Sequence, residues 1–158
     1  TGNCLIKRQV FKECGLFDCQ FEGLRMGDGE FGLRAHKKGF RNISNPKASR
    51  FHLKVKFGGL REMGSWDGLR PNKIFSPRPI PSVLYFYRKY WGDKPTLYYL
   101  IQTIPMSLNP YKYKETILGK LISILILFIF FPIVIIQIRE SWTIASNMLK
   151  QGAKIDYI

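Results

Sequence analysis

Residues 121–138 read LISILILFIFFPIVIIQI, a run without a single charged side chain. Its length of about 18 residues is close to the roughly 20 that a helix needs to cross the hydrocarbon core of a bilayer. Backbone polar groups in lipid must be satisfied within the segment, so the run predicts a helix. Pro132 removes one helical hydrogen bond, which allows a kink or a re-entrant shape. The run therefore indicates a transmembrane or re-entrant helix over 117–140, and the alternative is the buried helix of a soluble protein.

Basic residues flank this run on both sides, so the positive-inside rule gives no clean direction. They are Lys112, Lys114 and Lys120 before the run, Arg139 directly after it, and Lys150 and Lys154 in the tail 141–158. Most of the remaining positive charge is N-terminal. This bias favours a membrane protein with its globular part on the cytoplasmic face.

A proline-rich connection, 71–82, precedes the membrane region. Pro71, Pro77, Pro79 and Pro81 exclude a continuous helix there. Beyond it, residues 83–116 carry apolar and aromatic side chains at three- and four-residue spacing, which predicts amphipathic helices. Their mixture of Tyr, Trp, Arg and Lys is typical of helices on a membrane surface, and two ordinary packed helices are the alternative.

Residues 1–70 alternate between two types of secondary structure. We expect strands at NCLIKR (3–8) and FRNISNP (40–46), and helices at RQVFKECG (8–15) and DGEFGLRAHKKG (28–39). Glycines end both helices, as Gly commonly does. This order predicts an α/β domain, although too few strands are present for a whole sheet.

Composition limits the partners of the chain. Its 158 residues hold 25 Lys and Arg against 11 Asp and Glu, a formal charge of +14, which indicates a polyanionic neighbour such as anionic lipid or a phosphate-bearing substrate. Nucleic acid is not expected, because zinc-ligand spacing and RNA-binding motifs are absent from the sequence. Three cysteines without a C-x-x-C pair favour a reducing compartment. The start at Thr1, without Met or a leader, leads us to expect a fragment of a longer chain.

The segment GDGEFGLR (27–34) carries the chemistry that the sequence suggests. Asp28 and Glu30 stand two residues apart at a glycine-rich helix entrance, and Arg34 follows Glu30 by four residues. One interpretation is a helix N-cap at Asp28 with an exposed Glu30–Arg34 ion pair. The other is a carboxylate that accepts a proton from an attacking hydroxyl, with an arginine nearby that keeps it ionised.

A series of short motifs gives that segment a context. Gly2-Asn3, Lys7-Arg8, Gly15-Leu16-Phe17-Asp18, the acidic motif around Asp28 and Gly39-Phe40 follow one another within about the first 55 residues. This ordered series resembles the C-terminal half of the catalytic domain of family 2 glycosyltransferases, which are inverting enzymes with a GT-A nucleotide-sugar fold. The resemblance implies an incomplete α/β GT-A domain in 1–70, followed by amphipathic helices and one transmembrane helix.

The resemblance also implies roles for individual residues. Asp28 matches the general base that deprotonates the acceptor hydroxyl, and Glu30 and Arg34 match its supporting pair. Gly2 and Asn3 match substrate-binding positions. Gly27 stands where the family often has Glu, so the usual acidic doublet is incomplete.

Three further residues are candidates in 50–70. His52 lies where many enzymes of this fold have a histidine that reaches the divalent metal, and the alternative is a hydrogen-bonded structural histidine. Arg61 and Trp66 lie in a glycine-rich run that suits a lid over substrate, or a solvated surface loop. The Mg²⁺ or Mn²⁺ ion would be held mostly by an N-terminal half that this sequence lacks, so the fragment alone is expected to be inactive.

The function implied is transfer of a sugar from a nucleotide-sugar donor to a lipid-linked or saccharide acceptor near membrane lipid, in polysaccharide or glycolipid synthesis. The alternative function is that of a non-catalytic basic membrane-interaction module, which binds anionic lipid without needing Asp28.

Overall fold

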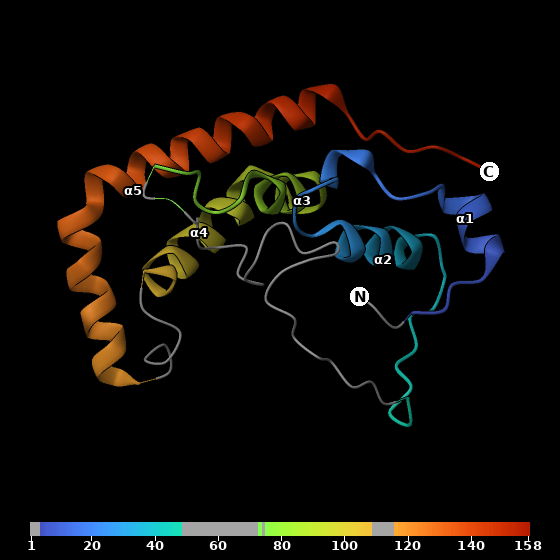
Figure 1. Cartoon of the computed structure of the whole chain (residues 1–158), viewed down its shortest axis with the longest axis horizontal. Coiled ribbons are helices and arrows are strands. Elements are labelled where there is room, and N and C mark those ends of the chain that lie inside the picture. Colours follow the sequence, from blue (N-terminus) through green and yellow to red (C-terminus); the bar gives the residue numbers. More distant parts are fainter. Residues whose placement is uncertain (1–3, 49–72, 74, 109–115) are drawn as a thin grey trace. The chain divides into compact units, whose positions relative to one another are not determined.

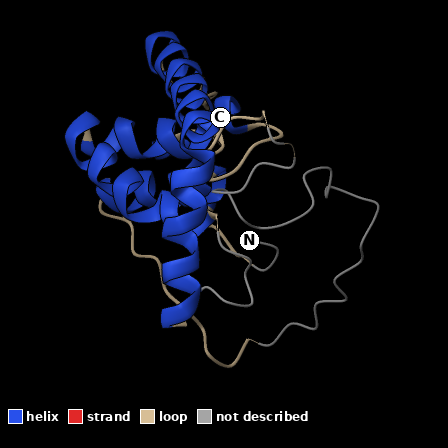
Figure 2. Cartoon of the chain, turned by 90° about the vertical axis from the view of Figure 1, so that its left-hand side faces the viewer, coloured by secondary structure: helices blue, strands red, loops and turns tan. Residues whose placement is uncertain are grey.

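The computed structural model describes residues 4–48, 73, 75–108 and 116–158. It divides into two compact units, Thr1–Trp66 with Ala153–Ile158, and Asp67–Gly152. Every regular element in the described residues is a helix (Figure 2). The prediction of an α/β fold is therefore wrong for this part of the chain, and we describe the two units separately.

The N-terminal unit contains α1 (Arg8–Cys14), the 3-10 helix η1 (Cys19–Phe21) and α2 (Gly27–Lys37), so both predicted helices are confirmed. Three aromatic rings join α1, the following turn and α2. The ring of Phe31 lies 5.2 Å from that of Phe11 and 4.7 Å from that of Phe17, measured between centroids. Apolar burial around these rings holds the two helices together. The buried apolar residues of this unit are Cys14, Phe21, Phe31 and Ala35.

Neither predicted strand of this unit is present among the described residues. Residues 4–7 and 40–45 have no regular secondary structure. Leu5 and Ile43, which would have formed the apolar faces of the two strands, are exposed. A strand is stable only when a neighbour pairs with its backbone and its apolar face is covered, and the described residues supply helices instead.

The second unit contains three helices, α3 (Pro81–Trp91), α4 (Asp93–Ser107) and α5 (Ile117–Gln151), which pack on one another. Both helices predicted within 83–116 are confirmed. α3 begins at Pro81, because proline suits the first turn of a helix, where its missing N–H is not needed. The buried apolar residues are Val83, Leu84, Tyr85, Phe86, Leu100, Ile104, Val134, Ala145 and Met148.

Helix α5 contains the apolar run and continues beyond the predicted end at 140 to Gln151. The Thr116 side chain caps its start by accepting a hydrogen bond from the Gly119 N–H at 3.0 Å. Figure 1 shows that α5 bends sharply, and Pro132, which cannot donate a helical hydrogen bond, explains such a bend. Of the described residues, only α5 forms a helix long and apolar enough to cross a membrane.

Candidate functional site

The acidic segment forms the first turn of α2. Asp28 is the second residue of the helix, and its exposed side chain accepts a hydrogen bond from the Gly29 N–H at 2.9 Å. The N-cap residue is Met26, with φ of 77°, so the interpretation of Asp28 as the N-cap is wrong by two positions. Asp28 still lies where the partial positive charge of the helix N-terminus favours a carboxylate.

Gly27 directly precedes Asp28 in the helix. A Cβ atom at this position would lie 3.1 Å from the Cβ atom of Phe21, which is buried. The close approach of η1 to the start of α2 therefore explains why a glycine stands here. A larger residue at position 27 would require Phe21 to shift by a few tenths of an ångström.

The carboxyl of Asp28 has a pKa below its ordinary value of 3.8. Partial desolvation raises this pKa, but hydrogen bonds to the carboxylate, among them the bond from the Gly29 N–H, outweigh this effect and lower it. Asp28 is consequently an ionised, exposed carboxylate at neutral pH. Such a group is able to accept a proton from a hydroxyl placed against it.

Glu30 and Arg34 form the predicted ion pair one helical turn apart. Arg34 Nη2 lies 3.1 Å from Glu30 Oε2, and Arg34 Nε lies 3.2 Å from Glu30 Oε1. The pair was expected on the surface, but Glu30 is fully buried and the Arg34 side chain is only 11% exposed. A buried ion pair of this kind orients α2 against the rest of the unit, whereas an exposed pair would lie on the solvated surface of the helix.

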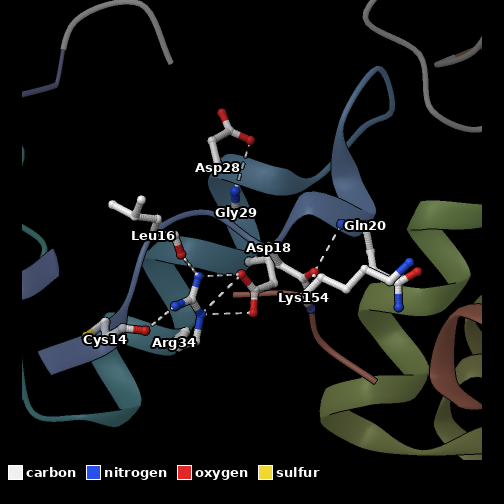
Figure 3. Close-up of polar contacts among 9 residues, drawn as sticks. Cys14, Leu16, Asp18, Gln20, Asp28, Gly29, Arg34 and Lys154 are labelled. Carbon is white, nitrogen blue, oxygen red and sulfur yellow. Dashed lines mark hydrogen bonds and ion pairs between the residues drawn. The ribbon is translucent and has the colours of Figure 1, made fainter. Parts of the chain in front are cut away.

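Arg34 also ties α2 to the end of α1. Its guanidinium donates to the carbonyl oxygen of Cys14 and, at 2.7 Å, to that of Leu16 (Figure 3). The planar fork of arginine is suited to such simultaneous contacts with carboxylate and carbonyl groups. The first turn of α2, and with it Asp28, is thus fixed relative to the turn 15–18.

Sequence reasoning missed the support of this turn by the C-terminal tail. Asp18 is buried, and its Oδ1 accepts hydrogen bonds from the N–H groups of Gln20 at 3.1 Å and Lys154 at 3.0 Å (Figure 3). The Leu16 N–H donates to the Asp156 carbonyl at 2.7 Å, and the Cys19 N–H to that of Lys154 at 2.9 Å. Asp18 and Lys154 are separated by 136 positions in the sequence, and no motif in the sequence indicates that they are in contact.

Five predicted site residues, Gly2, Asn3, His52, Arg61 and Trp66, lie outside the described residues. Their proximity to Asp28 stays a prediction. Of the predicted residues that are described, Asp28, Glu30 and Arg34 lie on one helix.

No protein family, curated protein or solved structure matches this chain. The geometry of the site is therefore the basis for a functional proposal. Within the described ranges, no three His, Cys, Asp or Glu side chains gather into a group that would suit a metal ion.

Proposed function

We propose that the chain belongs to an inverting glycosyltransferase that moves a sugar from a nucleotide-sugar donor to a membrane-proximal or lipid-linked acceptor, with Asp28 as the general base. The observation that carries this proposal is an exposed, ionised carboxylate on a helix turn that a buried ion pair holds in place. The reaction class is proposed from the ordered motifs of residues 2–40, which resemble those of family 2 glycosyltransferases. The product would be a polysaccharide or a glycolipid.

In this reaction the acceptor hydroxyl gives its proton to an oxygen of Asp28. The acceptor oxygen attacks the anomeric carbon of the donor sugar, and the bond from that carbon to the nucleotide diphosphate breaks, with its electron pair leaving on the diphosphate. Any carboxylate is a far weaker base than an alkoxide, so proton transfer accompanies bond formation rather than preceding it. Glu30 and Arg34 act as positioning residues, because both are turned into the unit.

A divalent metal would stabilise the charge of the leaving diphosphate. The described residues do not assemble the ligands for it, so this chain's part in the reaction is limited here to the base and its supports. His52 remains the predicted contribution to metal binding. The predominance of cations among residues 1–70 supports a catalytic unit on the cytoplasmic face of the membrane.

Asp28→Asn tests the proposal in the full-length protein that carries this chain. The substitution keeps the shape of the side chain and removes its basicity, so turnover should fall by about 10²- to 10⁴-fold while folding is retained. Glu22→Gln is the matched control, because Glu22 is an exposed carboxylate in the same unit that no motif implicates. Retention of turnover in Asp28→Asn would eliminate the assignment of the base.

A second candidate function is that of a basic membrane-interaction module. The exposed apolar side chains of α5 and the charge of +14 favour it, because together they suit insertion into an anionic bilayer. Such a module would bind anionic liposomes in a salt-sensitive manner and would be indifferent to Asp28→Asn. Loss of transfer in that variant with unchanged liposome binding distinguishes the enzyme from the module.

A further inference from the structure

Helix α5 has two parts with different surroundings. From Leu121 to Phe131 most side chains are exposed, only Ser123 is buried, and all of them except Ser123 are apolar. From Val134 onwards one stripe is buried, consisting of Val134, Gln137, Ser141, Ala145 and Met148. A helix that is apolar all round requires an apolar solvent, whereas a helix with one buried stripe packs on a protein surface. The first part therefore belongs in lipid and the second part belongs against α3 and α4.

A polar cluster marks the level at which the lipid-exposed part ends. The Arg78 guanidinium donates to Gln137 Oε1 at 3.0 Å and to Ser107 Oγ at 2.7 Å. Ser107 is the last residue of α4, so α4 ends beside the C-terminal end of the apolar run of α5. Because an arginine is costly in hydrocarbon, this cluster lies at or above the membrane surface.

The chain must return from this cluster to the start of α5. Only residues 109–116 connect Leu108 with Ile117, and a connection of that length reaches at most about 30 Å when fully extended. If the apolar run crossed the bilayer, Ile117 would lie on the opposite face, about 30 Å of hydrocarbon away. The connection would then have to cross as well, with its backbone unpaired and with Lys112, Lys114 and Glu115 in lipid. A single crossing by α5 is therefore incompatible with the position of α4.

The charges at the two ends of the apolar run agree with this geometry. Lys112, Lys114 and Lys120 precede the run, and Arg139 and Lys150 follow it. A transmembrane helix would place the lysines before the run and the cations after it on opposite faces, although the positive-inside rule favours cations on one face. If both ends lie at one face, all of these cations are able to contact the same anionic lipid headgroups.

We propose that α5 enters and leaves the membrane at the same face, so that its apolar run is a re-entrant segment submerged in one leaflet. The bend of α5 and the presence of Pro132 fit a helix that turns back towards the surface (Figure 1). The exposed face of α4, which carries Leu97, Tyr98 and Ile101, adds an apolar surface of the same unit for the bilayer interface. This arrangement is independent of any enzymatic activity.

The arrangement is tested with single-cysteine proteins and a membrane-impermeant maleimide. Cys4→Ser, Cys14→Ala and Cys19→Ser provide the cysteine-free background, into which Ile117→Cys or Lys120→Cys places a reporter before the apolar run. Asn147→Cys places a reporter after it, at an exposed position of α5. A fourth protein retains only the exposed Cys19, whose N–H donates to the carbonyl oxygen of Lys154, three residues beyond the end of α5. Labelling is compared in intact bacterial cells, in inverted inner-membrane vesicles and after detergent.

We expect all four cysteines to react from one and the same face. Reaction of Ile117→Cys and Lys120→Cys from the face opposite to that of Asn147→Cys would overturn the proposal, and so would reporters before the run that react only in detergent. Trypsin digestion of the unmodified chain in the two preparations provides a second measurement that needs no substitution. Cleavage on both sides of the run from one face supports a re-entrant α5, and protection of one side refutes it.

Discussion

Removal of the Arg34 side chain should loosen the whole N-terminal unit. Arg34→Ala leaves the fully buried Glu30 without its ion-pair partner and takes a donor from the carbonyls of Cys14 and Leu16. Breaking a buried pair by removing one partner typically costs about 3–5 kcal/mol. Because the Arg34 side chain is 11% exposed, solvent screens little of this loss.

A loss of that size approaches the entire stability of a small domain, which is about 5–15 kcal/mol. Amide hydrogen exchange is therefore the appropriate measurement, because it reports opening of α1 and α2 even when the second unit stays folded. The exchange of both helices should accelerate by about 10²- to 10³-fold, which corresponds to about 3–4 kcal/mol. Arg34→Lys keeps the charge but loses the fork, so its effect should be smaller and measurable where Arg34→Ala unfolds completely.

His36→Ala is the control, because His36 is exposed on the same helix. Its effect on exchange should remain within about 0.5 kcal/mol. A replacement of the pair by apolar residues, Glu30→Met with Arg34→Met, should recover much of the stability lost in Arg34→Ala, because no charge is then buried alone. If Arg34→Ala changes exchange no more than His36→Ala does, the buried pair does not hold α2 in place.

Two further predictions concern packing. Gly15→Ala places a Cβ atom against Ile155 and 3.0 Å from the Asp156 carbonyl oxygen, whereas Gly23→Ala, the control, meets open space at a similarly positive φ. Gly15→Ala should therefore lower the free energy of unfolding in denaturant by about 1–3 kcal/mol more than Gly23→Ala does. Equal losses in the two variants would contradict the packing of the tail on Gly15. Leu84→Ala in the core of the second unit should cost about 2–5 kcal/mol in detergent, and Leu97→Ala, on the exposed face of α4, less than about 1 kcal/mol. A comparable loss in both variants would show that Leu97 is covered by protein.

Periodicity predicted the helices of this chain well. The three- and four-residue spacing of α3 and α4 and the uncharged run of α5 specify helices locally, and each is present. The end of α5 was placed too early because Arg139 and Glu140 end the apolar run, although charged residues on one face do not end a helix. The stop comes from Gly152, whose φ of 74° is unfavourable for other residues.

Tertiary contacts decided what the sequence left open. The four-residue spacing of Glu30 and Arg34 predicted their ion pair, but its burial depends on carbonyl groups from another segment. The strands expected at 3–8 and 40–46 required partners that the described residues do not contain, since pairing is a property of two segments and not of one. Likewise, the role of the turn residue Asp18 depends on the distant Lys154, whose N–H donates to its side chain.

The contact between Asp18 and Lys154 has a consequence for biosynthesis. Residues 4–48 leave the ribosome long before residues 154–156, which complete their hydrogen bonds. Chains generally fold in units as they are made, but the hydrogen bonds between residues 16–19 and 154–156 can form only after α5 has been synthesised. The N-terminal unit therefore completes these hydrogen bonds last, long after its helices α1 and α2 have been synthesised.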